Sequence, residues 1–185
     1  MPPRGVLVRR EAVPRYGRKK IFRGYCFDVV RDDVRWPNQK RLSRDLIIHP
    51  GISVIVPLPD PRHIVLLRQY RYGAQGYLWE IPAGTLDAKE APLECAKREL
   101  EEETGYRARK WSLLTSCFAS PGFNTEVIHC FLAADLRKTV SRLEDDEVLE
   151  ARVFTVEEVE EMIRKREIQD AKSLVALFYF LMGRK

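Results

Sequence analysis

Glutamates crowd into one short segment of this chain, within residues 84–106, and their spacing could do chemistry. On a helix, Glu99, Glu102 and Glu103 fall on one narrow strip beside Arg98, because residues three and four apart share a helix face. Like charges at that spacing cost a helix about 0.2–0.5 kcal/mol per pair. A hard divalent cation such as Mg²⁺ relieves the repulsion, since it binds carboxylate oxygens and shares its other positions with water and phosphate. The segment therefore predicts a metal-dependent phosphate site.

The same segment carries the signals of the helix that would position these acids. Pro92 suits a first helical turn, where its missing N–H costs nothing. Gly105 suits the left-handed residue that ends a helix. Between them, Leu93, Ala96 and Leu100 recur at helical spacing and supply a stripe to bury. We therefore expect a helix that docks on a sheet while its acids line an adjoining cleft.

The rest of the chain reads as short strands with two further helices. Thr155 to Glu158 resembles a capping box that opens a helix through about Lys165, and a last helix is expected from Asp170 to Met182. A bend is expected at Trp36-Pro37-Asn38. The expected strands are Val6–Val8, Ile21–Val30, Leu46–Ile48, Ile52–Pro57, Ile64–Arg68, Leu113–Phe118, Val127–Ala133 and Ala151–Phe154.

Strands with helices set between them and at the end predict an α/β (α+β) fold, built as an α/β/α sandwich with a mixed sheet. A soft boundary is expected at Pro50-Gly51. It separates an N-terminal antiparallel β-element, residues 1–50, from the main domain, residues 51–185. A chain of 185 residues has enough volume for one such domain with a small appendage.

Composition narrows the class of protein. Hydrophobic residues make up 45% of the chain and charged residues 32%, which is ordinary for a globular protein. No apolar run approaches the length of a membrane span, and the N-terminus lacks the apolar core of a secretory signal. The four cysteines include no C-x-x-C pair, so they predict small buried residues of a reducing cytoplasm rather than a zinc site or disulfides: Cys26, Cys95, Cys117 and Cys130.

Charge is unevenly placed along the chain. Residues 1–23 hold eight Lys or Arg and one acid, a balance of +7, whereas the remainder holds 24 basic and 26 acidic residues. Such an arm suits a polyanion or, more simply, an edge strand kept from aggregating by its charge. The second interpretation is favoured because no aromatic residues interleave and no nucleic-acid motif is present. Neither a nucleic-acid nor a membrane partner is expected.

Seven residues of the carboxylate segment match one template together. The set resembles, without a gap, the signature of the Nudix hydrolase family, with Leu100 and Tyr106 in its two hydrophobic positions. The resemblance implies the Nudix fold and Mg²⁺-dependent hydrolysis of a nucleoside diphosphate linked to another group, with Mn²⁺ as a substitute metal. The seven matching residues are Gly84, Glu90, Arg98, Glu99, Glu102, Glu103 and Gly105.

The resemblance also implies roles by position. Glu99 and Glu103 match the metal-binding pair, with Glu102 beside them, and the carbonyl of Ala83 resembles a backbone metal ligand. Arg98 would orient the glutamates by charge-assisted hydrogen bonds, although an ordinary surface salt bridge is the simpler alternative. An acidic loop before the strand at Ala151 is similar to the loop that supplies the general base in some Nudix subfamilies. The candidate base is Glu147, which would also contact metal, with Glu144 and Glu150 as competitors.

Features outside the signature narrow the substrate. Pro121 lies sixteen residues after Gly105, a placement that resembles ADP-ribose pyrophosphatases among Nudix enzymes. The stretches Arg68–Tyr72, Leu78–Gly84 and Asp170–Ser173 also look like that subfamily. This implies that ADP-ribose and water give AMP and ribose 5-phosphate. Rival functions are a Nudix hydrolase of a nucleotide sugar or dinucleoside polyphosphate, a Nudix-like module that senses a nucleotide without hydrolysing it, and an RNA-processing protein that uses the basic arm.

Substrate contacts follow from the same resemblance. Arg71, and either Arg44 or Arg41, would hold the pyrophosphate, because a guanidinium fork suits phosphate oxygens. In that subfamily the N-terminal β-element commonly pairs with a second subunit, which implies a homodimer whose pockets draw on both chains. The remaining expected contacts are Glu80 beside the arginines, Ser120 and Glu126 near the terminal ribose, and Trp36 on adenine, although a tryptophan at a turn is more often a packing residue.

Overall fold

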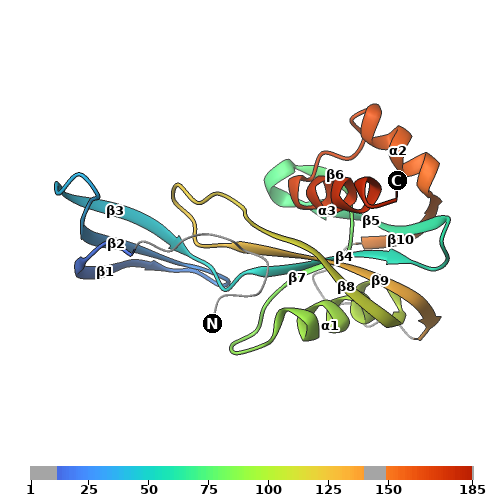
Figure 1. Ribbon diagram of the computed structural model, residues 1–185, viewed down its shortest axis with the longest axis horizontal. Helices are drawn as coiled ribbons and strands as arrows, with labels where there is room; N and C mark the ends of the chain where they lie inside the picture. Colours follow the sequence, from blue (N-terminus) through green and yellow to red (C-terminus); the bar gives the residue numbers. More distant parts are fainter. Residues whose placement is uncertain (1–11, 140–148, 185) are drawn as a thin grey trace. The chain divides into compact units, whose positions relative to one another are not determined.

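The computed structural model describes residues 12–139 and 149–184, in two compact units. Unit 1 contains the residues up to Gly51 together with Ser116–Ile128, and unit 2 contains Ile52–Thr115 and the residues from His129 onward. The strands form three sheets within the described residues, and Figure 1 shows their labels. The proposed split into a dimerisation element and a hydrolase domain stays a prediction.

Unit 1 is built on a three-stranded antiparallel sheet in the order β1-β2-β3. Arg18 of β1 donates two hydrogen bonds of 2.6 Å to Asp32 of β2, whose side chain is buried. The loop at residues 119–126 also belongs to this unit. The N–H of Ile47 donates to the carbonyl of Phe123, and the N–H of Thr125 donates to the carbonyl of Ile47. The strands are β1 (Arg15–Arg23), β2 (Asp28–Arg35) and β3 (Arg41–Ile48).

One prediction for this region differs from the structure. The expected strand Ile21–Val30 is wrong, because a turn at residues 24–27 divides it between β1 and β2. That turn includes Gly24, where an added Cβ would lie 2.7 Å from the carbonyl oxygen of Phe27. The expected bend after Trp36 is confirmed. The expected strand Val6–Val8 lies outside the described residues.

Unit 2 contains most of two sheets. One is four-stranded, in the order β7-β4-β9-β8, and the other is three-stranded, in the order β10-β5-β6. Strands β6 and β7 are short and were not anticipated from the sequence. The strands are β4 (Ile52–Leu58), β5 (His63–Arg71), β6 (Gly76–Glu80), β7 (Ala83–Thr85), β8 (Tyr106–Phe118), β9 (Val127–Lys138) and β10 (Leu149–Thr155), and a short 3₁₀ turn covers Tyr72–Ala74.

Helices cover β4 from both sides, which confirms the expected α/β/α layering. Figure 1 shows α1 (Pro92–Thr104) on one side of the β4 sheet and α3 (Ala171–Met182) on the other, and both helices contact β4. The apolar stripe of α1 packs as the sequence predicts, since Ala96 and Leu100 are fully buried against Ile55. Helix α2 (Val156–Arg164) contacts β5 and β10.

The helix ends follow the sequence signals. Pro92 begins α1, and Gly105 ends it with a φ of 66°. Thr155 and Glu158 form both bonds of the predicted capping box at the start of α2. Asp170 caps α3 by accepting a hydrogen bond from the N–H of Ser173. Since α1 carries the clustered glutamates, its well-defined ends fix where those side chains can lie.

All four cysteines are free thiols. Cys95 and Cys130 are buried as expected, but the expectation is wrong for Cys26, which is exposed in the turn between β1 and β2. Burial raises the pKa of the Cys95 thiol to about 12, so it stays protonated near neutral pH. Among the described helices, none is both long and apolar enough to cross a membrane.

Candidate active site

The clustered glutamates divide into two kinds on α1. Glu99 and Glu103 are on the buried side of the helix, 9% and 3% exposed, although neither is apolar. Glu102 is only half-buried. Ionised carboxylates are rarely buried without partners, because removing a charge from water is costly. The two buried glutamates therefore require specific contacts from a neighbouring segment of the same chain.

Glycine and backbone supply those contacts. Glu103 accepts a 2.9 Å hydrogen bond from the N–H of Ala83. Glu99 lies against the next residue, Gly84, so closely that an added Cβ there would be 1.7 Å from its Oε1. The two carboxylates, one helical turn apart, thus meet consecutive residues of β7. This convergence requires glycine at position 84, since any side chain would occupy the place of Glu99.

Arg98 connects three of the acids. Its Nη1 donates to Glu99 at 2.6 Å and to Glu102 at 3.1 Å. Its Nε and Nη2 donate to the two carboxylate oxygens of Glu90, both at 3.1 Å, and Nη2 also reaches the carbonyl of Thr85 at 3.2 Å. These bonds raise the pKa of Arg98 and lower that of Glu90, chiefly through the Arg98–Glu90 hydrogen bonds. All four side chains are thereby held in fixed positions.

The donor set suits a hard divalent cation. Glu99, Glu102 and Glu103 offer carboxylate oxygens on one helix, and Ala83 adds a backbone carbonyl beside them, which are the ligand types that Mg²⁺ prefers. Within residues 12–139 and 149–184 no three acidic, histidine or cysteine side chains are already arranged around a common metal position. The assignment of Ala83, Glu99 and Glu103 to a metal therefore stays a prediction.

Arg71 is one of the two predicted pyrophosphate-binding arginines. It lies in unit 2 and is held there by Glu80. Its Nε and Nη2 donate to the two oxygens of Glu80 at 2.9 and 2.7 Å. The Glu80 side chain is 2% exposed, whereas that of Arg71 is 39% exposed. These hydrogen bonds raise the pKa of Arg71, and the charges of Glu103 and Asp170 add to the effect. Arg71 is therefore a permanent cation in the electrostatic reach of Glu103.

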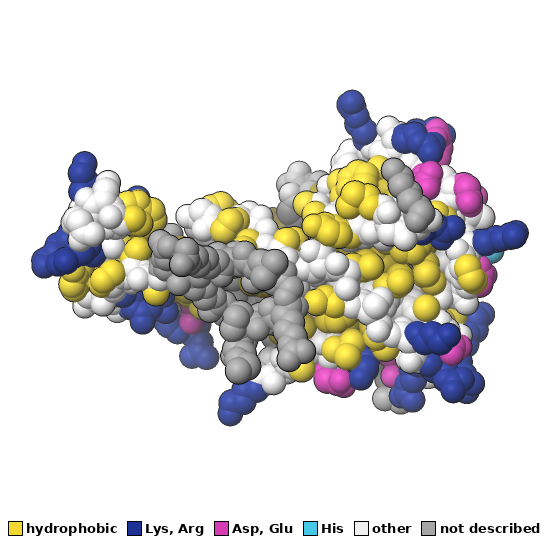
Figure 2. Space-filling view, viewed as in Figure 1, with side chains coloured by type: hydrophobic (Ala, Val, Ile, Leu, Met, Phe, Trp, Pro, Cys, Tyr) yellow, Lys and Arg dark blue, Asp and Glu magenta, His cyan; other side chains and the backbone are white. Residues whose placement is uncertain are grey.

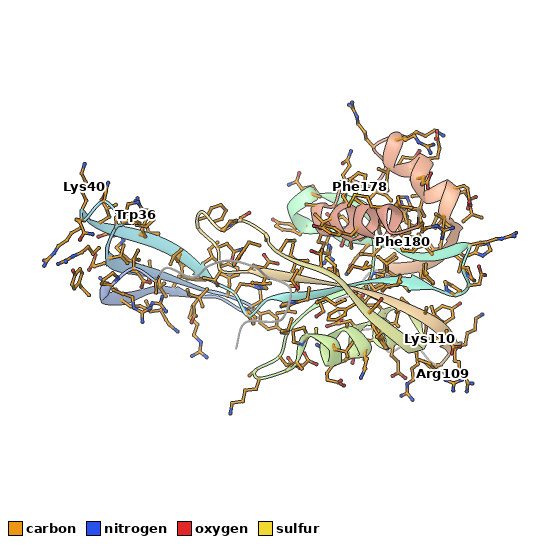
Figure 3. All side chains as sticks on the ribbon, viewed as in Figure 1. Trp36, Lys40, Arg109, Lys110, Phe178 and Phe180 are labelled. Carbon is orange, nitrogen blue, oxygen red and sulfur yellow. The ribbon has the colours of Figure 1, made fainter. Side chains whose placement is uncertain are left out.

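The other predicted substrate contacts belong to unit 1. Arg44 lies 4.7 Å from the ring centroid of Trp36 and shares with it and Pro121 a pocket of about 260 Å³. Figure 3 shows Trp36 and Lys40 at the bend between β2 and β3. The side-chain carboxylate of Glu126 accepts from the amide of Asn124 at 3.1 Å, and Ser120 is half-buried. Arg41 is exposed and stacks on Tyr16 instead.

Of the three candidate general bases, only Glu150 lies within the described residues. Glu147, the first choice, and Glu144 lie outside the described residues. Glu150 is the second residue of β10 and accepts two hydrogen bonds from Arg152, at 2.8 and 2.9 Å, which lower its pKa. An acid held in this way is a weaker base at a given pH, so the structure offers nothing that prefers Glu150 over Glu147.

Sequence reasoning missed two polar groups near Arg71. Lys172 lies within the Asp170–Ser173 stretch, for which the sequence predicts no individual roles. In the structure it donates a 2.5 Å hydrogen bond to Glu80. Gln69 lies on the same face of β5 as Arg71, since strand residues two apart share a face. It is 7% exposed, and its Oε1 has no hydrogen-bond partner in the described part of the chain. No local pattern marks either residue, because both depend on contacts made by the folded sheet.

Comparisons with known proteins define the class. The NUDIX domain model matches residues 48–178, and the chain belongs to the NUDIX family. Over 164 residues it is 37% identical to the ADP-ribose pyrophosphatase of Bacillus subtilis (strain 168), covering 88% of this chain and 89% of the relative. Over 163 residues it is 36% identical to the methanol dehydrogenase activator of Bacillus methanolicus, covering 87% and 88%.

A solved structure agrees on the fold. The crystal structure of an ADP compounds hydrolase superposes with a TM-score of 0.80, covering 93% of this chain and 95% of that one. The sequences are 23% identical, so this likeness speaks for the fold alone. It confirms the predicted Nudix architecture.

Proposed function

We propose that this chain hydrolyses the diphosphate bridge of ADP-ribose. Water adds to one phosphorus, the P–O bond of the bridge breaks, and AMP and ribose 5-phosphate leave. The observation that carries the proposal is the convergence of Glu99 and Glu103 on Ala83 and Gly84, with Arg98 fixing the neighbouring acids. The name of the Bacillus subtilis relative supports the choice of ADP-ribose.

Mg²⁺ is the proposed cofactor, with Mn²⁺ as a substitute. Glu99, Glu103 and the carbonyl of Ala83 would hold it, with Glu102 close by. When bound, a divalent ion there would neutralise charge on the phosphate oxygens and make a water molecule more acidic. Arg98 contributes by holding Glu99 and Glu102 in place before substrate arrives, which removes the cost of ordering them during the reaction.

The proposed substrate contacts are the residues that the family resemblance implies. Arg71 would grip the diphosphate, since Glu80 uses one edge of its guanidinium and leaves the remaining donors for phosphate. Arg44 would assist, with Trp36 available to the adenine ring and Ser120 and Glu126 to the terminal ribose. The pocket that Arg44, Trp36 and Pro121 line supports Arg44 over Arg41.

Glu147 is the proposed general base. A carboxylate is suited to taking the proton of the attacking water when it lies within one hydrogen bond of it. Replacing Glu147 with Gln should lower kcat at least ~100-fold because the proton acceptor is lost, and should affect Mg²⁺ affinity less, because an amide oxygen remains as a metal contact. An unchanged rate in Glu147→Gln would move the base elsewhere, with Glu144→Gln and Glu150→Gln as the next variants.

We also propose that the protein is a homodimer that works in the cytoplasm. Unit 1 exposes several large apolar side chains, among them Ile21, Phe22 and Tyr25. Figure 2 shows hydrophobic side chains among Lys and Arg over the strands of this unit. Contiguous apolar surface on a soluble domain often marks a protein interface. The four free thiols suit a reducing compartment.

The activity is tested with purified protein, ADP-ribose and Mg²⁺, and the products are identified by chromatography and ³¹P NMR. AMP and ribose 5-phosphate in equal amounts are expected. A panel of ADP-glucose, GDP-mannose and diadenosine tetraphosphate measures preference by kcat/KM. Faster turnover of another compound would move the function to that substrate. Tight binding of ADP-ribose without any product across the panel would instead favour a non-hydrolysing sensor.

A further inference from the structure

Near the first turn of α3, four charged side chains from β5, β6 and the start of α3 form one cluster. We use the term α3 charge cluster for Arg71, Glu80, Asp170 and Lys172. Lys172 donates to Glu80 at 2.5 Å and lies 2.9 Å from Asp170. Glu80 binds Arg71 through both of its oxygens. The cluster contains two cations and two anions, so it is neutral as a whole.

Burial makes each member depend on the others. The side chains of Glu80, Lys172 and Asp170 are 2%, 14% and 17% exposed. Burial alone would raise the pKa of Glu80, but its bonds to Arg71 and Lys172 outweigh burial and lower the pKa. Glu80 is thus an anion held between two cations. If one cation is removed, the other must neutralise Glu80 by itself.

The cluster is also tied mechanically to the glutamate site. Two consecutive residues of α3 hold two consecutive residues at the end of β6. Lys172 binds Glu80, the last residue of β6, and the hydroxyl of Ser173 accepts a 2.9 Å hydrogen bond from the N–H of Ile81. Two residues later, the N–H of Ala83 binds Glu103 of α1. The segment from Glu80 to Ala83 therefore carries Arg71's anchor at one end and the metal-binding candidates at the other.

We propose that Lys172 is a positioning residue of the diphosphate site, which keeps the charge of Arg71 available to the substrate by sharing the neutralisation of Glu80. This inference rests on the proposed function. The side chain of Lys172 is only 14% exposed and is not expected to touch substrate. Without it, Arg71 alone must neutralise Glu80, so less of the Arg71 charge is available to a diphosphate anion.

The test compares Lys172→Met and Lys172→Arg with wild-type enzyme. Lys172→Met should raise the KM for ADP-ribose ~10-fold while kcat stays within ~3-fold, and Lys172→Arg should restore KM to within ~3-fold. The Kd for inorganic diphosphate, measured by calorimetry with Mg²⁺, should rise by the same factor as KM. Lys165→Met, which removes an exposed lysine at the end of α2, is the matched control and should change neither quantity.

Two further variants separate positioning from packing and from direct contact. Asp170→Asn keeps a helix-capping side chain but removes an anion, so the KM should stay the same or fall. A rise as large as that of Lys172→Met would mean that α3 packing is responsible and would overturn the proposal. In an Arg71→Met background, Lys172→Met should change kcat/KM less than ~2-fold, because its route of action is gone. Multiplicative losses would show that Lys172 acts independently of Arg71 and would also overturn the proposal.

The outcomes distinguish this inference from the activity on which it rests. If wild-type protein binds diphosphate but forms no AMP, the proposed function fails, while a ~10-fold weaker Kd in Lys172→Met still supports the role of Lys172. If wild-type protein hydrolyses ADP-ribose and Lys172→Met leaves KM and Kd unchanged, the role of Lys172 is rejected and the function stands. Should Lys172→Met not fold, Lys172→Gln removes the charge but keeps an N–H donor for Glu80, and the same rise in KM and Kd is required.

Discussion

Glu103 illustrates how one buried carboxylate can be both structural and reactive. It is 3% exposed and accepts the N–H of Ala83, so its replacement is not a simple surface change. Glutamine retains an oxygen for that N–H but loses the negative charge. The contribution of Glu103 to folding and its contribution to metal binding can therefore be separated by this single substitution.

Glu103→Gln should lower kcat for ADP-ribose by about 100-fold, because a metal contact is worth several kcal/mol in the transition state. Stability should fall by only about 1 kcal/mol, since the hydrogen bond to Ala83 persists. Steady-state kinetics at saturating Mg²⁺ and urea unfolding measure the two effects. Glu94→Gln, at an exposed position in the first turn of α1, is the control. A rate within ~3-fold of wild type would remove Glu103 from the metal site.

Gly84 is constrained by space. A Cβ at this position would lie 1.7 Å from Oε1 and 1.9 Å from the carboxyl carbon of Glu99, so Gly84→Ala must displace that side chain. We expect a loss of about 1–3 kcal/mol in stability from overpacking. Because Glu99 is moved, the apparent affinity for Mg²⁺ should also fall at least ~10-fold, as measured by titration of the activity. Gly73→Ala is matched, since nothing lies within 4 Å of its Cβ; equal effects of the two variants would contradict the geometric argument.

At the scale of elements, the sequence predicted the helix ends, because nearby residues determine where a helix begins and ends. The course of α1 follows from Pro92, Gly105 and the buried stripe, and the start of α2 follows from the Thr155–Glu158 box. The turn at residues 24–27 was not predicted, because the apolar and β-branched residues around it continue the strand pattern. Strands β6 and β7 were not predicted, because these short segments become strands only by pairing with β5 and β4. The contact of Lys172 with Glu80 joins positions 92 residues apart and has no sequence pattern.

The link between α3 and β6 should make stability depend on acid. The pKa of Glu80 is lowered in the folded protein from its usual 4.5. Its interactions therefore stabilise the fold above about pH 4.5, and this contribution is lost as the pH falls through the lower folded value. Thermal unfolding between about pH 7 and about pH 3 measures the loss.

In Glu80→Gln the two cations of the cluster lose their shared anion. Stability at pH 7 should drop by about 3–5 kcal/mol, and the remaining dependence on acid should be shallower than in wild-type protein. Glu94→Gln serves again as the exposed control, with a slope like that of wild type. If Glu80→Gln unfolds with an unchanged acid slope, another carboxyl group is responsible for it.

At the scale of the whole molecule, the apolar surface of unit 1 bears on assembly. Phe22 is 55% exposed and lies 6.5 Å, ring to ring, from Phe27 across the turn between β1 and β2. Strand β1 is also an edge strand, because its sheet runs in the order β1-β2-β3. Edges and apolar patches of this kind are usually covered in the functional state of a protein. A second copy of the chain would cover both at once.

If the chain forms the proposed homodimer, Phe22→Asp should give a monomer of 21.6 kDa, measured by light scattering after size exclusion. If each pocket draws on both chains, kcat/KM for ADP-ribose should fall at least ~10-fold in parallel with the loss of dimer, and raising the protein concentration should partly restore it. Met182→Asp changes an apolar residue of unit 2 that is 60% exposed, at the end of α3, and should leave mass and activity unchanged. A wild-type protein that is monomeric and active at micromolar concentration would show instead that one chain holds the complete site.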